Sequence, residues 1–517
     1  MQINILEYLE NAQYDPGKIA LVDGDRSYTF EEIRRFAKSC ATHLISRVDE
    51  ICRPIAVFLP KCAETVLVDL GIVFSGNLYT NLDVKSPARR ISLTIDNLQP
   101  RLIATSRTLA PQLQQMGIGE SQLLLVEDIF DASAPIDESA LADRLARVVD
   151  TDPLCIINTS GSTGVPKGVV LNHRSTIDFM DWCFDCLKLT GDERIGSLSP
   201  FFFDIYTLEL NLCLAKGATM VIVPDQLAIF PAKLMEFLSA QAISFIFWVP
   251  TIMVHIAEHG LLEEFDLSAL KDVFFAGEVF RTKHLNHWRR ALPAARFVNL
   301  YGPIEITVDC TYFVVDRELA DDDPLPIGYP CRNTDILILN ENDEPCKDGE
   351  RGELCVRGSS LAMGYWNDPE KTAKAFTQNP LNHHYPERVY RTGDIVYRRQ
   401  GGEIMYVGRR DFQVKHMGYR IELPEIECRV LAVDGIANAC VLYQHQKKEI
   451  TLFYESRESA IGPTEIRKKL AETLPKYMLP TAFHRMEELP RNGNGKIDRN
   501  RLNIQLQSMV DASAYAD

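Results

Sequence analysis

Apolar runs alternate with amphipathic stretches along most of this chain. "RPIAVFL" (53–59) precedes the helical stretch "CAETVLVDLGIVFSG" (62–76), and "ATMVIV" (218–223) precedes "PAKLMEFLSAQA" (231–242), which "ISFIFWV" (243–249) follows. Short β-branched runs separated by longer helical segments are typical of parallel strands joined by helices. The pattern therefore predicts layered α/β sheets over roughly the first 400 residues.

The pattern changes twice toward the C-terminus. "DILILNENDEPCKDGERGELCVRG" (335–358) and "RVYRTGDIVYRRQGGEIMYVGRR" (388–410) contain short β segments separated by Gly, Asn and Asp, which indicates hairpins and a small β subdomain. Beyond residue 410, helical and strand-like segments form a smaller α+β unit. We expect a large domain over residues 1–410 and a second domain over 411–517, with "QLQSMVDASAYAD" (505–517) loose at its end.

Composition and charge narrow the class of protein. The 517 residues are too many for one core, so two or more domains are expected. The formal net charge of 55 − 71 = −16 disfavours nucleic acid and anionic membranes as partners. No apolar run is long enough to span a bilayer, and the N-terminus lacks the features of a signal peptide, so we expect a cytoplasmic protein.

The thirteen cysteines are scattered along the chain. Their odd number and irregular spacing favour free thiols in a reducing compartment over a disulfide framework. Cys183 and Cys186 form a single CxxC pair inside the apolar periodicity of "STIDFMDWCFDCLKL" (175–189). We interpret them as core residues of a helix rather than as a metal or redox site.

The stretch "TSGSTGVPKG" (159–168) has the composition of a phosphate-binding loop but not the spacing of a Walker P-loop. Lys167 follows a proline and the β-branched "GVVL" (168–171) leaves the loop, so we expect it to join two strands. Its glycines permit positive φ and close backbone approach, and such a turn directs N–H groups toward an anion. An ordinary polar turn is the alternative. The loop supplies three glycines and four hydroxyls: Gly161, Gly164, Gly168, Thr159, Ser160, Ser162 and Thr163.

Four further motifs follow in order: "NLYGPIE" (299–305), "YRTGD" (390–394), "GRRDFQVKHMGYRIEL" (408–423) and "NGNGKID" (492–498). With the loop, they resemble the phosphate, adenine, ribose, hinge and C-terminal lysine motifs of the adenylate-forming (ANL) superfamily. That superfamily contains acyl-CoA synthetases, luciferases and peptide-synthetase adenylation domains. The resemblance covers almost the whole chain. It implies a large N-terminal domain of layered α/β sheets plus a small β subdomain, and a mobile C-terminal α+β domain with its hinge at Asp411.

The resemblance implies ATP and Mg²⁺ as cofactors, and the residue types agree with these roles. Tyr301 offers an aromatic face to adenine, and Asn299 can pair with the amino edge of the base. Asp394 suits vicinal ribose hydroxyls, and Glu305 is an oxygen ligand of the kind Mg²⁺ prefers. The residues expected to bind ATP are Thr159, Ser160, Gly161, Ser162, Thr163, Gly164, Asn299, Leu300, Tyr301, Gly302, Pro303, Ile304, Asp394, Tyr406, Arg409 and Lys496.

By resemblance, Lys496 is the main catalyst of the first step, in which a mobile cation would bridge the substrate carboxylate and the α-phosphate. Lys167 and Glu305 complete the expected catalytic group. One departure from the family is Ile304, where a threonine is usual, so a hydroxyl near the phosphates is missing. Thr307 or a water are the alternatives for replacing it. A smaller departure is Asn81, where the family often has proline.

The stretch "SPFFFDIYTLELNLCL" (199–214) places Asp204 among apolar residues, where an unpaired carboxylate would be costly. The position resembles the acid that holds the α-ammonium in amino-acid-activating domains. The alternative is an Asp that accepts backbone N–H groups at a strand end or helix cap. The remaining substrate-pocket positions carried over from adenylation domains are Ile205, Leu208, Phe247, Phe274, Ala276, Leu300, Val308 and Asp309.

This tight, mostly apolar set looks most like that of stand-alone prolyl-adenylating ligases, with the D-alanine ligases next. Asp309 fits neither of these patterns. It either faces a hydroxyl or second amine of the substrate or turns toward solvent. We treat His173, His383 and His384 as structural, because a substrate carboxylate needs no base.

The expected activity is ATP-dependent formation of an aminoacyl-adenylate and pyrophosphate, followed by transfer to a thiol. The chain stops soon after the lysine motif, so we expect a free-standing carrier protein with a phosphopantetheine thiol, or else coenzyme A, as the acceptor. The alternatives are an acyl- or aryl-CoA synthetase and a nucleotide-binding protein without catalysis. Lys496, Glu305 and Asp394 together argue against the last of these.

Overall fold

A computed structural model describes residues 2–130, 135–161, 165–445, 447–456, 461–491 and 497–514. The chain divides into two compact units. Unit 1 consists of Met1–Val84, Ile95–Asn158 and Gly168–Arg410, and unit 2 of Lys85–Thr94, Thr159–Lys167 and Asp411–Asp517. A hinge at Asp411 stays a prediction.

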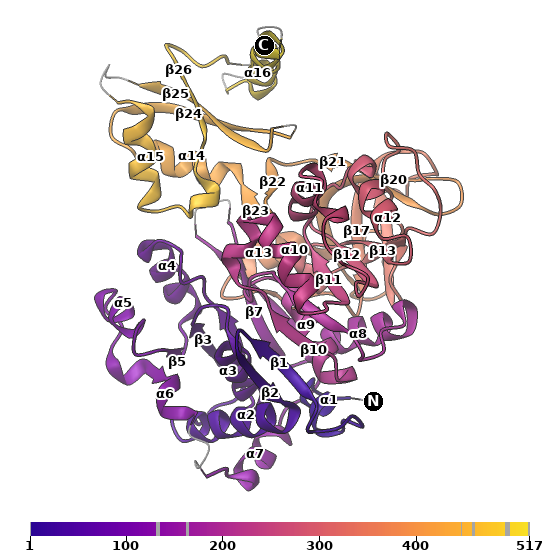
Figure 1. The fold of residues 1–517 in the computed structure, drawn as a ribbon. Helices are drawn as coiled ribbons and strands as arrows, with labels where there is room; N and C mark the ends of the chain where they lie inside the picture. The colour runs from indigo at the N-terminus through magenta and orange to yellow at the C-terminus, as the bar shows by residue number, and fades with distance from the viewer. Residues whose placement is uncertain are drawn as a thin grey trace. The chain divides into compact units, whose positions relative to one another are not determined.

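Among the described residues of unit 1, the largest sheet has nine strands in the order β15-β14-β13-β12-β11-β9-β10-β1-β2 (Figure 1). From β13 to β1 every neighbouring pair is parallel, and β14, β15 and β2 are antiparallel additions at the two edges. The strands are β1 (Ile19–Asp23), β2 (Arg26–Thr29), β9 (Arg194–Ser197), β10 (Thr219–Ile222), β11 (Phe245–Trp248), β12 (Asp272–Phe275), β13 (Arg296–Tyr301), β14 (Thr311–Val314) and β15 (Tyr329–Pro330). The predicted parallel α/β layer is confirmed.

A second sheet has seven strands in the described chain, in the order β18-β8-β7-β4-β3-β5-β6. They are β3 (Pro54–Phe58), β4 (Leu78–Asn81), β5 (Leu102–Thr105), β6 (Leu123–Leu125), β7 (Pro153–Thr159), β8 (Lys167–Asn172) and β18 (Gly364–Tyr365). The phosphate-type loop therefore lies between two neighbouring strands, β7 and β8, as the sequence predicted.

The predicted small β subdomain is a third sheet, which has five strands within the described residues: β16 (Thr334–Leu339), β17 (Gly352–Gly358), β19 (Phe376–Gln378), β20 (Arg388–Arg398) and β21 (Ile404–Arg409). Its neighbouring strands pair antiparallel. In β20 and β21, Asp394 lies directly opposite Arg409. This register brings two of the predicted ATP residues together.

Helices alternate with these strands along the chain. They are α1 (Leu6–Glu10), α2 (Phe30–Ile45), α3 (Ala63–Phe74), α4 (Ala88–Leu98), α5 (Ala110–Gln115), α6 (Val126–Ile129), α7 (Glu138–Leu145), α8 (His173–Leu187), α9 (Ile205–Lys216), α10 (Pro231–Ala240), α11 (Pro250–Glu258), α12 (Thr282–Ala291) and α13 (Pro369–Ala375). A capping box between Thr29 and Glu32 starts α2, and Gly217 in the left-handed region ends α9. Helices α3 and α9 are buried along nearly their whole length, which explains why their sequences are apolar on all sides.

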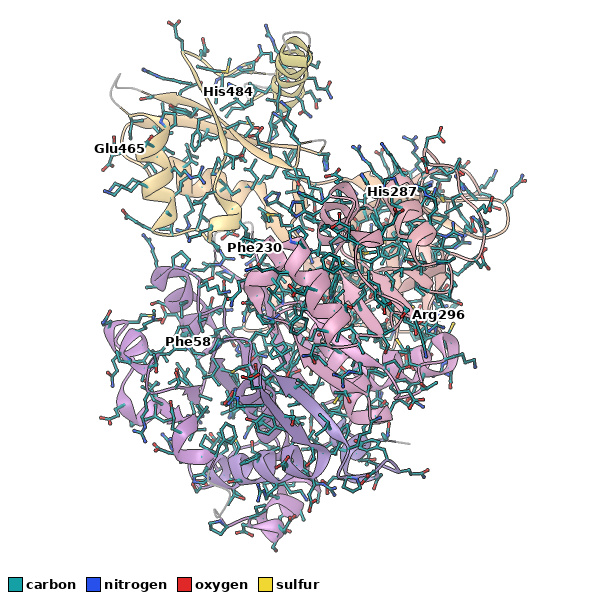
Figure 2. The ribbon with its side chains drawn as sticks, viewed as in Figure 1. Phe58, Phe230, His287, Arg296, Glu465 and His484 are labelled. Atoms are coloured by element: carbon teal, nitrogen blue, oxygen red, sulfur yellow. The ribbon has the colours of Figure 1, made fainter. Side chains whose placement is uncertain are left out.

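The core of unit 1 fills the space around both large sheets. Phe58 in β3, labelled in Figure 2, is fully buried. Arg296 at the start of β13, also labelled there, instead pairs with Asp272 on the neighbouring β12, its Nε 2.7 Å from the carboxylate. Apolar side chains therefore occupy the interior, and a charged pair lies where two strands begin.

In unit 2 the described residues form a three-stranded sheet of β24 (Ile436–Gln444), β25 (Glu449–Ser456) and β26 (Ala482–Met486), and a hairpin of β22 (Gln413–His416) and β23 (Tyr419–Glu422). Helices α14 (Leu423–Leu431) and α15 (Pro463–Ala471) pack into one apolar cluster with the sheet. A second cluster joins the sheet to α16 (Arg499–Ala514). His484 of β26, labelled in Figure 2, stacks on Phe453 of β25 with ring centroids 4.9 Å apart.

The expectation of a loose C-terminal tail is wrong for residues 505–514, which belong to α16. Leu502 and Leu506, one helical turn apart, are buried against Cys440 and Phe453 of the sheet. This apolar pair orders the helix through a tertiary contact, which the polar local sequence does not reveal. The sequence also missed the strand β26.

Two of the fully buried carboxyl groups of unit 1 have raised pKa values. Asp69 of α3 and Glu209 of α9 are both completely buried, and burial raises the pKa of each to about 8. Asp69 accepts hydrogen bonds from Asn81 and Tyr206, and Glu209 accepts one from Ser197, which lowers the pKa only in part. Both groups therefore hold a proton in the folded chain at a pH where they are ionised in the unfolded chain.

We predict that Asp69→Asn stabilises the protein at alkaline pH. Because the folded pKa is raised, the stability contributed by the bound proton is complete below the ordinary pKa near 3.8 and is lost as pH rises toward about 8. Inside that window each such group contributes a loss of about 1.4 kcal/mol per pH unit. Urea unfolding at several pH values should show a flatter decline for Asp69→Asn than for wild type, with Glu209 leaving a residual slope. An unchanged slope would contradict the prediction.

Candidate functional site

The phosphate-type loop makes close backbone contacts. A Cβ at position 161 would lie 2.2 Å from the carbonyl oxygen of Val165, and one at position 168 would lie 2.6 Å from a methyl group of Ile156. Neither Gly161 nor Gly168 has a positive φ, so the expectation of positive φ is wrong for these two. Glycine is required there because the chain folds back too tightly for any side chain.

In unit 2, the described end of the loop contacts a carboxylate. The N–H of Gly161 donates to Oε2 of Glu425 at 3.3 Å, and Arg90 donates to Oε1 of the same group at 2.6 Å. The hydroxyl of Ser160 donates to the carbonyl of Arg420 at 2.5 Å. The N–H of Gly161, which the sequence analysis assigned to phosphate binding, is thus hydrogen-bonded to a carboxylate oxygen. Ser162, Thr163 and Gly164 lie outside the described residues.

Four of the predicted nucleotide residues come together in unit 1. The Tyr301 hydroxyl donates to Oδ2 of Asp394, and Arg409 donates to Oδ1 at 2.8 Å. A second guanidinium nitrogen of Arg409 donates to the Thr392 carbonyl at 3.0 Å, and the Tyr406 ring centroid lies 6.3 Å from that of Tyr301. Asp394 is therefore held rigidly at both oxygens, each of which keeps a further lone pair for a ligand hydroxyl.

The adenine motif occupies the end of β13 and the segment after it. Asn299 is buried, and its side-chain amide donates to the Pro326 carbonyl at 2.7 Å. Its predicted pairing with adenine stays a prediction. Leu300 is buried in the core, and a Cβ on Gly302 would lie 2.4 Å from the Cα of Asp309. The segment after Tyr301 therefore folds back on itself, which fixes the residues that follow.

Glu305 lies in the short helical turn Ile304–Ile306 and is fully buried. The hydroxyl of Tyr365, in β18, donates to its Oε1 at 2.8 Å. The sequence did not single out Tyr365, because only the pairing of β18 with β8 brings it to this carboxylate. Thr307, one of the alternatives for the hydroxyl missing at Ile304, is also fully buried, and its oxygen has no hydrogen-bond partner in the described part of the chain.

Two predicted residues are tied to the C-terminal segment. Lys496 lies outside the described residues, so its catalytic role stays a prediction. Asp411 accepts a hydrogen bond from the backbone of Gln413 at 3.2 Å. That contact turns the chain into β22.

Lys167 is the first residue of β8 and is partly buried.

The apolar substrate-pocket positions belong to one continuous buried cluster of unit 1. Strands β11, β12 and β13 lie side by side and parallel (Figure 1). Phe247 and Phe274 are direct neighbours across β11 and β12, with ring centroids 6.5 Å apart at 74°. The members of this cluster that the sequence singled out are Ile205, Leu208, Phe247, Phe274, Ala276, Leu300 and Val308.

Asp204 occupies the N-cap position of α9 and is partly exposed. Its side chain makes no capping hydrogen bond to the helix. The helix-cap alternative is therefore wrong, because the carboxylate does not satisfy the N–H groups at the start of α9. Its charge raises the pKa of the buried Cys155 thiol in part, after the larger effect of burial.

The alternative in which Asp309 turns toward solvent is wrong, because this side chain is only 2% exposed. Val308, just before it, has φ = 65°, a strained conformation for a β-branched residue. Burial followed by the charge of Asp309 raises the pKa of the Cys183 thiol, and that charge also contributes to the raised pKa of Cys331. The sequence does not indicate that these cysteines lie near Asp309, because they come from separate elements.

The histidines and the CxxC pair differ in their surroundings. His173 is buried, burial lowers its pKa to about 4, and its ring nitrogen accepts the N–H of Ile5 at 3.4 Å. His383 and His384 are exposed. Cys183 and Cys186 lie within α8, and both are free thiols. Within the described ranges, no group of three or more His, Cys, Asp or Glu residues is arranged to hold a metal ion.

Comparison with known families agrees with this geometry. Residues 9–366 match the family model of the AMP-binding enzyme, and residues 425–496 match that of the AMP-binding enzyme C-terminal domain. The fold and the gathered motif residues are those of an adenylate-forming enzyme of the adenylation-domain type. The chain belongs to the AMP-binding enzyme family, which confirms the resemblance seen in the sequence. ATP with Mg²⁺ is the cofactor pair of this family.

Relatives and solved structures support the same family. The chain is 31% identical over 497 residues to tyrocidine synthase 1 of Brevibacillus parabrevis, covering 95% of this chain and 44% of the relative. It is 29% identical over 493 residues to zwittermicin A synthase ZmaJ of Bacillus cereus, covering 94% and 91%. The crystal structure of IdnL1 matches with a TM-score of 0.79 and 28% identity, over 95% of this chain and 99% of that chain. The chain spans less than half the length of several curated relatives, tyrocidine synthase 1 among them.

In the part that the structure describes, the chain has no helix with the length and apolar character needed to cross a membrane.

We predict that Tyr301→Phe weakens ATP binding while leaving in place the aromatic ring that is expected to face adenine. Losing the hydroxyl removes one of the two donors that hold the buried Asp394, at a cost of about 1–3 kcal/mol. The KM for ATP should rise by about tenfold, whereas the KM of the second substrate stays the same. Initial rates with one substrate varied at a time would measure both constants. A parallel rise in both would contradict an effect confined to the nucleotide.

Proposed function

We propose that this chain activates a small or cyclic amino acid with ATP and then passes the aminoacyl group to the phosphopantetheine thiol of a separate carrier protein. A proline-like substrate is favoured, and D-alanine comes next. In the first step a substrate carboxylate oxygen attacks the α-phosphorus and pyrophosphate leaves. In the second step a thiol sulfur attacks the acyl carbon and AMP leaves.

The nucleotide half of this proposal rests on the group around Asp394. In the proposed complex, Asp394 accepts the ribose hydroxyls while Tyr301 and Arg409 keep it fixed. Glu305 would hold Mg²⁺, because a carboxylate already oriented by Tyr365 is a hard oxygen ligand, and Mg²⁺ commonly takes few protein carboxylates together with substrate phosphates. Bound there, the ion would neutralise charge on the phosphate oxygens. Lys167 and Lys496 would add positive charge on the other sides of the phosphates.

The observation that carries the amino-acid assignment is the setting of Asp204. It is a partly exposed carboxylate that does not cap its helix, and it directly precedes Ile205 of the apolar pocket cluster. An ammonium group of the substrate is the counter-charge that such a carboxylate suits. Phe247 and Phe274 are fully buried and in ring contact within that cluster, and their bulk would favour a small side chain or a ring as the substrate.

Transfer to a thiol is the second part of the proposal. The C-terminal domain would turn at Asp411 after adenylation, so that Lys496 leaves and the segment containing Gly418 faces the thiol. A free-standing carrier protein is the favoured acceptor, and coenzyme A is the alternative. An acyl- or aryl-CoA synthetase is the second candidate function, and it would need a substrate without an amino group beside Asp204.

We predict that Asp204→Ala abolishes amino-acid-dependent ATP–pyrophosphate exchange. The substrate ammonium would lose its counter-charge, while the nucleotide site would stay intact. The assay is run first with wild type against the common L- and D-amino acids, proline and D-alanine included, and against fatty and aryl acids. The best amino acid is then used with the variant.

The matched control is Asp185→Ala, which removes an exposed carboxylate, the surface partner of Arg332. It should exchange at the wild-type rate. If Asp204→Ala were equally active, or if only fatty or aryl acids drove exchange in wild type, the amino-acid assignment would be overturned.

We predict that Asp309→Val changes the preference among amino-acid side chains without changing the KM for ATP. The substitution replaces a buried carboxylate beside Val308 with an apolar group of similar size. The kcat/KM for substrates with a hydroxyl or second amine should therefore fall relative to that for purely apolar ones. Ratios of kcat/KM across a side-chain panel would measure the shift. Loss of ATP use instead would contradict the assignment of Asp309 to the substrate pocket.

A further inference from the structure

Three polar side chains from separate elements of unit 1 meet in its interior. Nδ2 of Asn81, at the end of β4, donates to Oδ2 of Asp69 in α3 at 2.9 Å. The hydroxyl of Tyr206 in α9 donates to the same oxygen at 2.9 Å. Asp69 is 0% exposed, Tyr206 1% and Asn81 8%. These contacts join α3, β4 and α9 through one carboxyl oxygen.

This network is a costly way to join the three elements. Oδ1 of Asp69 and Oδ1 of Asn81 are buried and have no hydrogen-bond partner among the described residues. Partly satisfied polar groups in a core stabilise less than apolar groups of the same shape, so packing alone does not account for them. A proline at position 81, the residue noted above as frequent in the family, has no side-chain amide and could not make this link.

The network also reaches the turn that carries Asp204. Nδ2 of Asn81 donates to the backbone carbonyl of Phe201 at 3.2 Å. The Phe201 ring stacks on the Tyr206 ring, with centroids 4.3 Å apart and an interplanar angle of 24°. Phe201 lies three residues before Asp204, and Tyr206 lies two residues after it. Both flanks of Asp204 are therefore anchored to the same buried carboxyl group.

Within the turn, the backbone N–H groups of Phe203 and Thr207 make local hydrogen bonds. The N–H of Phe203 donates to the Pro200 carbonyl at 3.0 Å, and the N–H of Thr207 donates to the Asp204 carbonyl at 2.9 Å. These bonds set the curvature of the turn, and the hydrogen bonds at Phe201 and Tyr206 connect it to distant elements.

We propose that Asp69, Asn81 and Tyr206 are positioning residues that fix the Pro200–Asp204 turn and so aim the Asp204 carboxylate at the amino group of the substrate. The inference rests on the proposed function of Asp204 and extends it to a buried network that touches no substrate. A charge pair loses much of its value when either group is displaced, so a binding carboxylate on a turn needs such support.

The test compares Asn81→Ala and Tyr206→Phe with wild type in ATP–pyrophosphate exchange, with the amino acid that gives the strongest exchange. Each variant removes one tie to the turn, and Tyr206→Phe keeps the stacked ring. The KM for the amino acid should rise by about tenfold in each, while kcat and the KM for ATP change by less than about twofold. Because both ties act on one turn, the double variant should raise the KM by less than the product of the single effects.

The matched control is Asn77→Ala at the other end of the same region, just before β4. Asn77 is 2% exposed, accepts the N–H of Arg53 at 2.9 Å and donates to the Ser75 hydroxyl at 3.1 Å, so its loss also removes side-chain hydrogen bonds of a buried residue. It should lower the thermal midpoint as Asn81→Ala does, but leave the KM for the amino acid unchanged. Asp69→Asn keeps an acceptor oxygen for Asn81 and Tyr206 and should therefore raise the KM less than Asp69→Leu.

The outcomes distinguish failure of the positioning role from failure of the proposed function. If Asn81→Ala and Tyr206→Phe lower only the thermal midpoint, as Asn77→Ala does, the network is core packing and the positioning role is overturned. The same holds if the KM values for ATP and amino acid rise together. If no amino acid supports exchange in wild type, or Asp204→Ala is fully active, the proposed function itself fails. Loss of activity in Asp204→Ala with normal KM in the network variants overturns only the positioning role.

Discussion

Parallel strands end at the same edge of their sheet, and the candidate site of this protein depends on that constraint. Strands β11, β12 and β13 pair in parallel and end near Phe247, Ala276 and Tyr301. Residues separated by many positions in the sequence therefore reach one edge without any special loop. The chain then folds back after Tyr301, where Gly302 approaches Asp309 too closely for a side chain. Both halves of the proposed chemistry, nucleotide and amino acid, adjoin this edge.

Three buried carboxyl groups share one mode of support. Tyr301 donates its hydroxyl to Asp394, Tyr365 to Glu305, and Tyr206 to Asp69. A phenolic hydroxyl orients a carboxyl group by a single hydrogen bond, and its ring contributes apolar surface to the core. In the proposed function this leaves Asp394 for ribose and Glu305 for Mg²⁺, whereas Asp69 acts only through the turn before Asp204.

The hydrophobic pattern predicted the parallel layers, the β subdomain and the loop between β7 and β8 because these features depend on local alternation of strand and helix. It missed β26 and the end of α16, since both are ordered by contacts with β25 that come from distant parts of the chain. The motifs identified Tyr301, Asp394 and Arg409, but the bonds that join them depend on the register between β20 and β21. Tyr365 and Asp69 carry no local signal at all.

The sequence by itself determined the family, the order of the motifs and the types of residue available for ATP and for an amino acid, because these depend on residue identity and spacing. Only the tertiary structure decided that Asp309 is buried, that Asp204 does not cap α9, and that Gly161 is needed for close approach rather than for positive φ. It alone brought Asp69, Asn81 and Tyr206 together. Burial and hydrogen bonding are properties of neighbours in space, and the linear order of residues does not specify those neighbours.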